Sequence, residues 1–188
     1  MREPSRSNDI IFTDPPAAVR LFGSPKWSWL WLIARLYVGY EWFSAGIGKL
    51  SNPAWTQTGA ALKGFWTASV AVPAAPAHPP VAFGWYRAFL QMLLDAQAYT
   101  WFSKLVVAGE LLIGIALILG LFTGIAAFFG GFMNWNFMMA GSASTNPVLF
   151  SLAIVLILAW KTAGWLGLDR WVLPLVGTPW QPGKVFTK

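Results

Sequence analysis

The sequence contains no cysteine and only one histidine, His78. Without cysteine the chain forms no disulfide, has no thiolate nucleophile and cannot hold a Cys-ligated iron–sulfur cluster. A single histidine also excludes a haem held by two histidines of this chain. We therefore expect no haem, iron–sulfur cluster or metal here. Any electrons that pass through the chain have to be taken up by a diffusible carrier or by a partner protein.

Charged residues are also scarce. They make up 11% of the 188 residues, whereas an ordinary soluble domain carries roughly 25%. Hydrophobic residues make up 56%, and 13 residues are tryptophan. The net charge is +6, but the basic residues stand singly beside apolar segments and form no run, so nucleic acid is not an expected partner. This composition predicts an integral membrane protein that sits in a lipid bilayer.

Four apolar segments are long enough to form membrane spans, since about 20 helical residues cross a hydrocarbon core near 30 Å. Asn146-Pro147 marks the start of the fourth segment, because proline is favoured in the first helical turn. We predict an all-α membrane protein with an antiparallel four-transmembrane-helix bundle over residues 27–165, a cytoplasmic N-terminal arm over 1–26 and a cytoplasmic C-terminal tail over 166–188. The four predicted spans are Trp27 to Gly48, Trp101 to Leu121, a third from the 122–124 turn to Ala140, and a fourth from Asn146 to Trp165.

The connection over residues 51–98 is long for a helical bundle and should have its own structure. Apolar residues between 55 and 70 fall mostly on one helical face, a proline-rich stretch follows at 72–80, and a second aromatic-rich segment runs from 83 to 94. We predict two short interfacial helices in this first extracytoplasmic loop, lying over the mouth of the bundle.

Orientation follows from the basic residues near the ends of the spans. Eight lie on the side of the termini and four on the side of the first connection: Arg2, Arg6, Arg20, Lys26, Lys161, Arg170, Lys184 and Lys188 against Lys49, Lys63, Arg87 and Lys104. We therefore expect both termini in the cytoplasm, in a multi-pass protein of a bacterial or archaeal cell membrane. The first 26 residues lack the pattern of a cleaved secretory signal.

Three ionisable side chains lie inside the predicted spans: Arg35, Glu41 and Glu110. A charge in hydrocarbon costs a few kcal/mol, so such residues usually pair inside a bundle. Arg35 and Glu41 are six residues apart, about 120° around a helix, and do not face each other. We therefore expect Arg35 to pair with Glu110. Two interpretations remain open: a structural ion pair between the first two spans, or a proton-handling site in which these three residues are catalytic.

Three basic residues are candidates for substrate binding at the outer side. Lys49 and Lys104 lie at the outer ends of the first two spans, and Arg87 lies in the connecting loop. They either anchor the protein by reaching the headgroups or form a positive funnel that draws in a small anion.

Two asparagines and one tryptophan complete the candidate binding residues. Asn134 and Asn136 are two apart on one predicted helix, so only one of them can face a central site, and we prefer Asn134. The other is expected to bond a neighbouring helix. Trp42 is either a packing residue or a surface that holds a quinone ring.

The order and spacing of several short motifs resemble the DoxX/DoxD family of small four-helix membrane proteins. The resemblance extends from about Trp31 to Pro174. It rests on Arg35-x3-Gly39-x6-Gly46-x2-Lys49, on the run Gly109 to Gly114 leading to Leu119-Gly120-Leu121-Phe122-Thr123, on Asn134-x-Asn136, on the stretch Ala140 to Pro147, and on Gly167-Leu168-Asp169-Arg170.

This resemblance implies a role in sulfur-compound oxidation. In the best-described members the membrane subunit belongs to a thiosulfate:quinone oxidoreductase, which joins two thiosulfates into tetrathionate and passes the electrons to quinone. There it works with a second small subunit, DoxA. We expect any such partner of this chain to be a separate polypeptide, because no DoxA-like segment follows the fourth span.

Two functions remain open from the sequence. The first is the membrane subunit of a quinone-linked oxidoreductase that oxidises thiosulfate or a related small sulfur anion at the outer face. The second is a non-catalytic accessory subunit of a larger respiratory or redox membrane complex. A small-solute carrier is less favoured, because the sequence shows neither an inverted repeat nor a broken helix of the transporter type.

Overall fold

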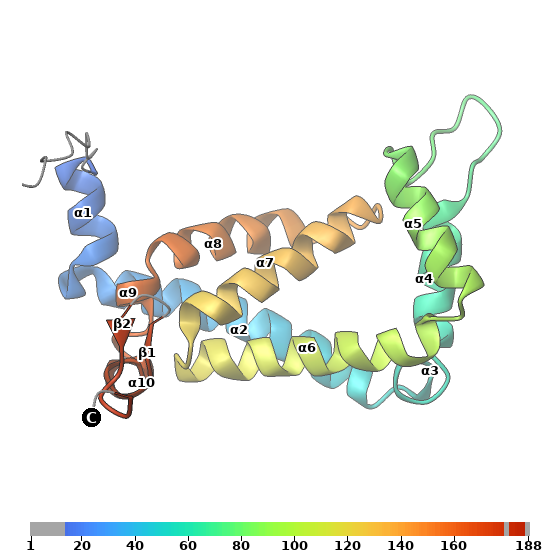
Figure 1. Ribbon diagram of the computed structural model, residues 1–188. Helices are drawn as coiled ribbons and strands as arrows, with labels where there is room; N and C mark the ends of the chain where they lie inside the picture. Colours follow the sequence, from blue (N-terminus) through green and yellow to red (C-terminus); the bar gives the residue numbers. More distant parts are fainter. Residues whose placement is uncertain (1–13, 179–180, 187–188) are drawn as a thin grey trace, which may run out of the picture.

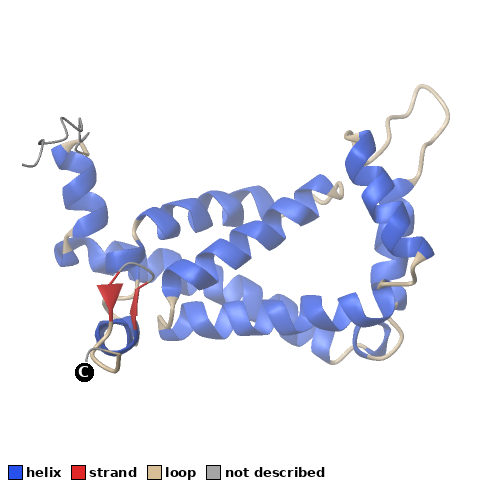
Figure 2. Ribbon diagram, viewed as in Figure 1, coloured by secondary structure: helices blue, strands red, loops and turns tan. Residues whose placement is uncertain are grey.

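The computed structural model describes residues 14–178 and 181–186, and helices account for nearly all of its regular structure (Figures 1 and 2). The all-α prediction is therefore confirmed. The elements in chain order are α1 (Pro16–Gly23), a 3-10 turn (Pro25–Trp27), α2 (Ser28–Leu50), α3 (Pro53–Thr56), α4 (Ala60–Val70), α5 (Gly84–Asp95), α6 (Tyr99–Leu119), α7 (Thr123–Met139), α8 (Asn146–Leu158), α9 (Trp160–Ala163), α10 (Asp169–Val176), β1 (Gly177–Thr178) and β2 (Gln181–Pro182).

Three of the four predicted spans coincide closely with single helices, namely α2, α6 and α7. The fourth is divided, because the chain breaks at Ala159 between α8 and α9. Helices α1 and α10, which the sequence analysis left as part of an arm and a tail, lie at the end of the bundle opposite α4 and α5 (Figure 1). Residues 1–13, 179–180 and 187–188 of the predicted arm and tail lie outside the described residues.

Glycines allow α2 and α6 to pack closely along their length. A Cβ atom at Gly39 would lie 3.0 Å from Ile118, one at Gly46 would lie 2.8 Å from Leu111, and one at Gly114 would lie 2.6 Å from the backbone N of Phe43. Small residues that bring backbones together are typical of helix pairs in membranes. Gly39 lies beside Ile118 and Gly46 lies beside Leu111, so residue numbers rise along α2 as they fall along α6. The two helices therefore run antiparallel (Figure 1).

The buried apolar residues form two clusters. The larger one lies inside the bundle of α2, α6, α7, α8 and α9, and includes Trp31, Val38, Trp42, Leu117 and Leu156. The smaller one lies at the end of the bundle where α4 and α5 cross α6 (Figure 1), and includes Leu62, Trp66, Tyr86 and Leu90. We call α3, α4 and α5 the cap. The cap is joined to the bundle by its own apolar core.

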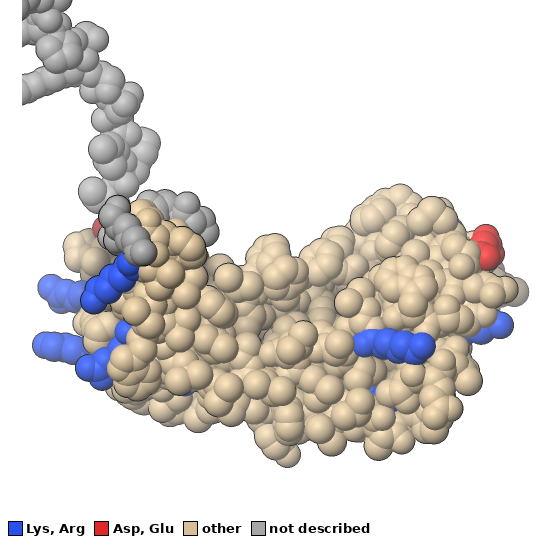
Figure 3. All heavy atoms as spheres, turned by 60° about the horizontal axis from the view of Figure 1, so that its bottom comes forward, with Lys and Arg blue, Asp and Glu red and all other residues tan. Residues whose placement is uncertain are grey.

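Within the described residues, α6 is the one helix whose length and apolar composition suffice to cross a membrane, and α8 is apolar but shorter. Large apolar side chains cover the outer surface of the bundle, among them Tyr40, Leu105, Leu112, Ile125, Phe128, Phe129, Phe132, Val148 and Ile154. On the face drawn in Figure 3, lysine and arginine lie towards the two ends, and the surface between them is mostly uncharged.

Candidate functional site

An ion pair joins the last turn of α2 to the middle of α6. Lys49 Nζ donates to Glu110 Oε1 at 2.8 Å. Glu110 is 1% exposed, and its second oxygen, Oε2, has no hydrogen-bond partner among the described residues. The ammonium group of Lys49 also lies 5.2 Å from the centre of the Trp55 ring, in the cap. A buried carboxylate thus depends on one lysine for its charge partner.

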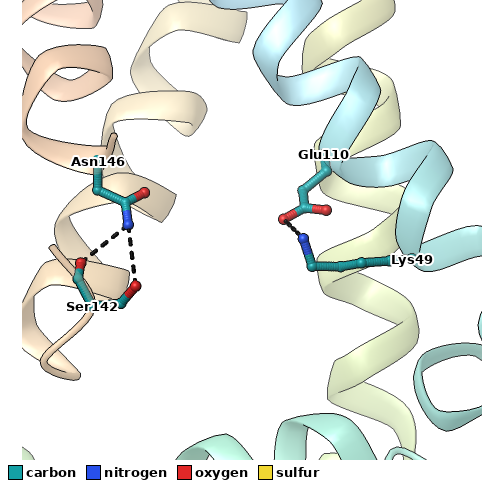
Figure 4. Close-up of polar contacts among 4 residues, drawn as sticks. All are labelled: Lys49, Glu110, Ser142 and Asn146. Atoms are coloured by element: carbon teal, nitrogen blue, oxygen red, sulfur yellow. Dashed lines mark hydrogen bonds and ion pairs between the residues drawn. The ribbon is translucent and has the colours of Figure 1, made fainter. Parts of the chain in front are cut away.

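This ion pair forms one side of a cavity of about 310 Å³, which we call the polar cavity. Ser142 and Asn146 face the pair from the opposite side, where Asn146 Nδ2 donates to the carbonyl of Ser142 at 3.1 Å (Figure 4). The cavity is lined by α2, by Trp55 and Phe65 of the cap, by Glu110, by Phe137, and by the α7–α8 connection with the start of α8: Glu41, Trp42, Ala45, Lys49, Trp55, Phe65, Glu110, Phe137, Ser142, Ser144, Thr145, Asn146 and Leu149. Lysine, carboxyl, hydroxyl and amide groups therefore converge on one space.

Two further predicted site residues lie at this cavity. Glu41 is half-buried in its wall and makes no hydrogen bond or ion pair with the other described residues. Trp42 is 3% exposed and stacks on Phe137, with ring centres 6.5 Å apart. The structure thus brings Glu41, Trp42, Lys49 and Glu110 to the walls of one cavity.

Arg35 does not pair with Glu110, so the predicted pair is wrong. Its Nη1 donates to the carbonyls of Leu117 at 2.6 Å and Ile118 at 3.1 Å, and its Nη2 donates to that of Leu166 at 3.2 Å. The reason is that α6 ends nearby, and the last carbonyls of a helix have no partners within the helix. Gly120, at φ +66°, leaves room for this contact, since a Cβ there would overlap Nη1. Arg35 joins three segments of the chain, away from the polar cavity.

Asp169 lies near Arg35, at the end of the bundle away from the polar cavity. The sequence analysis did not single out this residue. Its carboxylate accepts hydrogen bonds from the backbone N–H groups of Phe122 and Thr123, the latter at 2.9 Å, and so stabilises the start of α7. It also attracts Arg35 electrostatically. The signal was present in the motif Gly167-Leu168-Asp169-Arg170, which entered the sequence analysis only through the family resemblance.

The two asparagines have different surroundings. Asn136 Oδ1 accepts from the hydroxyl of Tyr86 at 3.0 Å, and its Nδ2 donates to the carbonyl of Phe132 at 2.8 Å, so Asn136 connects α7 to the cap. Asn134 is fully buried, and both atoms of its amide lack partners among the described residues. Neither asparagine lines the polar cavity. Burial raises the pKa of Tyr86 to about 12.

The remaining basic candidates, Lys104 and Arg87, lie outside the polar cavity. Lys104 is exposed near the start of α6, and Arg87 is half-buried on α5. Of the three predicted basic residues, the structure therefore brings Lys49 alone to the cavity. The opposite wall is formed by residues that the sequence analysis did not propose for the site: Ser142, Ser144, Thr145 and Asn146. They had entered it only in the Ala140 to Pro147 stretch of the family resemblance and, for Asn146, as the start of the fourth segment.

Two apolar spaces lie beside the polar cavity. An inner cavity of about 350 Å³ lies between the cap and α6 and α7, with Trp66, Tyr86 and Asn136 in its walls. A groove of about 550 Å³ runs along the outer surface between α6 and α7. The groove and the inner cavity share Phe102, Val106, Phe132 and Met133, and the inner cavity and the polar cavity share Phe65 and Phe137. The groove therefore adjoins the inner cavity, and the inner cavity adjoins the polar cavity.

Metal-ligating side chains are not clustered in the described part of the chain, where no group of three or more His, Asp or Glu residues could hold a metal ion. The side chains that line the polar cavity supply an ammonium group, two carboxyl groups, three hydroxyls and one amide.

Comparison with known proteins identifies the family. The family model described as DoxX matches residues 30–142, more than half of the chain, and this range contains α2, the cap, α6 and α7. No curated protein matches the chain, and no solved structure does. The matched range holds both partners of the Lys49–Glu110 ion pair. The chain therefore belongs to the DoxX family and, as a member of it, is a membrane protein.

Proposed function

We propose that this chain is the membrane subunit of a quinone-linked oxidoreductase. The observation that carries the proposal is the pairing of the buried Glu110 with Lys49 in a polar cavity next to the apolar inner cavity, which adjoins the groove on the outer surface of the bundle. The donor that we propose is thiosulfate or a related small sulfur anion. Two thiosulfates joined as tetrathionate release two electrons, and a quinone that takes up two electrons and two protons becomes a quinol.

The membrane arrangement that we propose has four spans: α2, α6, α7, and α8 together with α9. Helix α2 has 23 residues and α6 has 21, which correspond to about 35 and 32 Å at 1.5 Å per residue. The apolar outer surface between two basic ends supports this arrangement (Figure 3). In it the cap lies at the outer interface and both termini lie in the cytoplasm.

Within this proposal, the quinone enters from the bilayer along the groove between α6 and α7. The groove is lined by exposed apolar residues such as Leu105, Leu112 and Phe129, which suit an isoprenoid tail. The aromatic inner cavity next to it suits a flat ring, and the shared residues Phe65 and Phe137 separate that ring from the polar cavity. A ring that passes this pair reaches Glu110.

Glu110 is proposed as the proton donor to the reduced quinone, with Lys49 as its charge partner and Glu41 as the group that returns protons from the cavity. Glu110 Oε2 has no partner among the described residues, so a proton carried there is not held by another side chain. Lys49 and the hydroxyls of Ser142, Ser144 and Thr145 are the groups that we propose for binding the sulfur anion.

The test uses the purified chain, with any subunit that co-purifies, in lipid nanodiscs. Thiosulfate and a water-soluble quinone analogue are supplied, and quinol formation is followed by absorbance. We expect Glu110→Gln and Lys49→Gln to lower the rate at least a hundredfold. Lys161→Gln, which removes an exposed lysine of α9, is the matched control and should keep the wild-type rate. Equal rates in all four proteins would disprove the site.

A different outcome separates the accessory function from the enzymatic one. If the chain co-purifies with cofactor-bearing subunits, and if Glu110→Gln and Lys49→Gln leave quinone reduction by that complex unchanged, the chain serves as an accessory subunit. Mass spectrometry of the complex identifies the partners and any quinone that is bound.

A further inference from the structure

Three buried polar side chains in the middle of the bundle have atoms without hydrogen-bond partners among the described residues. These atoms are Nε1 of Trp42, both Nδ2 and Oδ1 of Asn134, and Oε2 of Glu110. The three residues are 3%, 0% and 1% exposed. More than nine in ten buried polar groups in proteins are hydrogen-bonded, because a group left unpaired loses its hydration without compensation. Four such atoms in one region require an explanation.

The packing of α6 against α7 places Asn134 at the level of Glu110. A Cβ at Gly109 would lie 3.2 Å from Met133 Sδ, and one at Gly130 would lie 3.3 Å from Ile113. These two contacts show that the helices run antiparallel, with residue 109 beside 133 and residue 113 beside 130. Asn134 therefore lies within one turn of Glu110 along the bundle, on the buried face of α7.

Trp42 reaches the same place from α2. A Cβ at Gly130 would lie 3.0 Å from Trp42 Nε1, and the Trp42 ring stacks on Phe137. Gly130, Asn134 and Phe137 follow one another at i, i+4 and i+7, so they lie on one face of α7. Trp42 thus covers the stretch of α7 that contains Asn134. The indole N–H and the amide therefore lie at the same buried stretch of α7, at the level of Glu110 along the bundle.

We propose that Trp42, Asn134 and Glu110 together bind internal water behind the polar cavity. The hydrogen-bonding groups match this ligand: the indole N–H and the amide NH₂ donate, and the amide oxygen and Glu110 Oε2 accept. A buried water makes about three hydrogen bonds, typically to groups that are otherwise unpaired. Because Gly130 has no side chain, the indole nitrogen lies close to the α7 backbone, one turn from Asn134.

A substrate does not fit the same role. Asn134 has no exposed surface and does not line the polar cavity, so a molecule in that cavity does not reach its amide. Water is the smallest partner that offers both donors and acceptors. Glu110 then has Lys49 on the cavity side and water on the interior side. Asn134 is a positioning residue, because it acts on Glu110 through the water. This inference is independent of the substrate in the polar cavity.

The experiment is nuclear magnetic resonance of the full chain in nanodiscs with ¹⁵N-labelled tryptophan indoles. Trp42→Phe assigns the indole signal of Trp42, and Trp31→Phe assigns that of Trp31. Trp31 is the matched control: it is 5% exposed, and its indole already donates to the carbonyl of Leu21 at 3.0 Å. We expect a cross-peak between Trp42 Nε1–H and water, with the sign of a long-lived bound water, and none for Trp31.

Two variants extend the test. Asn134→Leu keeps the volume and removes both amide groups, so the Trp42 cross-peak should fall at least fivefold. Glu110→Gln removes the exchangeable carboxyl proton, and the cross-peak should persist, which excludes relay through that proton. The proposal is overturned if the wild-type Trp42 indole shows no water cross-peak, if Asn134→Leu leaves it unchanged, or if Glu110→Gln abolishes it. The wild-type spectrum alone can overturn the proposal, so the test remains valid if a variant fails to fold.

Discussion

Lys49 and Glu110 are 61 positions apart in the sequence, and their Nζ and Oε1 atoms lie 2.8 Å apart. The lysine is partly exposed, with 22% of its side chain accessible, whereas the glutamate is buried. Both residues line the polar cavity, but the lysine is the more accessible of the two. This asymmetry allows a ligand to alter the pairing of a carboxyl group that solvent hardly touches.

The first prediction concerns the stability of this pair. Lys49→Met leaves the Glu110 carboxyl buried without its charge partner, and should lower the free energy of unfolding by about 3 kcal/mol. The double variant Lys49→Met with Glu110→Leu removes both charges, and should recover most of that loss. Unfolding of the single and double variants in detergent measures both effects. If the double variant loses as much free energy of unfolding as the two single variants lose together, the two side chains are not directly coupled.

The second prediction concerns the contact between α2 and α6. Gly114→Ala should destabilise the chain by about 2 kcal/mol, because the new Cβ would lie 2.6 Å from the backbone N of Phe43 and the helices have to move apart. Gly48→Ala is the matched control, since a Cβ there meets nothing within 4 Å. It should leave stability unchanged or raise it by up to about 1 kcal/mol through helix propensity. Thermal unfolding of both variants provides the comparison.

The third prediction concerns the start of α7. Asp169→Ala removes the acceptor of two backbone N–H groups, and should lower the free energy of unfolding by about 1–2 kcal/mol. Asp95→Ala is the control, because Asp95 is exposed and bonds only the side chain of Gln91, at 2.9 Å. It should change stability by less than about 0.5 kcal/mol. Similar melting temperatures for the two variants would show that Asp169 does not hold this helix end.

The fourth prediction is a pH dependence at the cap. In the unfolded chain Tyr86 loses its proton from about pH 10, whereas burial raises its pKa to about 12 in the folded protein. The unfolded state therefore binds fewer protons between pH 10 and 12, and stability falls as pH rises through this window. Below pH 10 the contribution is fully present.

Tyr86→Phe isolates this effect. It should lose about 1 kcal/mol at pH 8, where the hydrogen bonds to Asn136 are missing. Its stability should then fall less steeply than that of the wild type between pH 10 and 12. Because every other tyrosine is shared by the two proteins, the difference between their curves reports Tyr86. Parallel curves over this range would contradict the assignment.

Local sequence signals predicted most helices of the fold. Long apolar runs marked α2, α6 and α7, and the proline-rich stretch at 72–80 separated α4 from α5. These signals are reliable because backbone hydrogen bonding and the loss of apolar surface to water act along contiguous stretches of chain. No proline or glycine stands at the break at Ala159, so the break has no local signal in the sequence. The fourth span was therefore predicted as one helix instead of two.

The sequence by itself determined that Arg35, Glu41, Lys49 and Glu110 lie in or beside apolar helices, where charges have to find partners. It did not determine the partners. Only the tertiary structure decided that Glu110 pairs with Lys49 and that Arg35 bonds the carbonyls at the end of α6. The physical reason is that a pair across two helices depends on their register and crossing. In this chain the glycine contacts between α2 and α6 fix that register, bring the end of α2 to the middle of α6, and leave Arg35 at the other end.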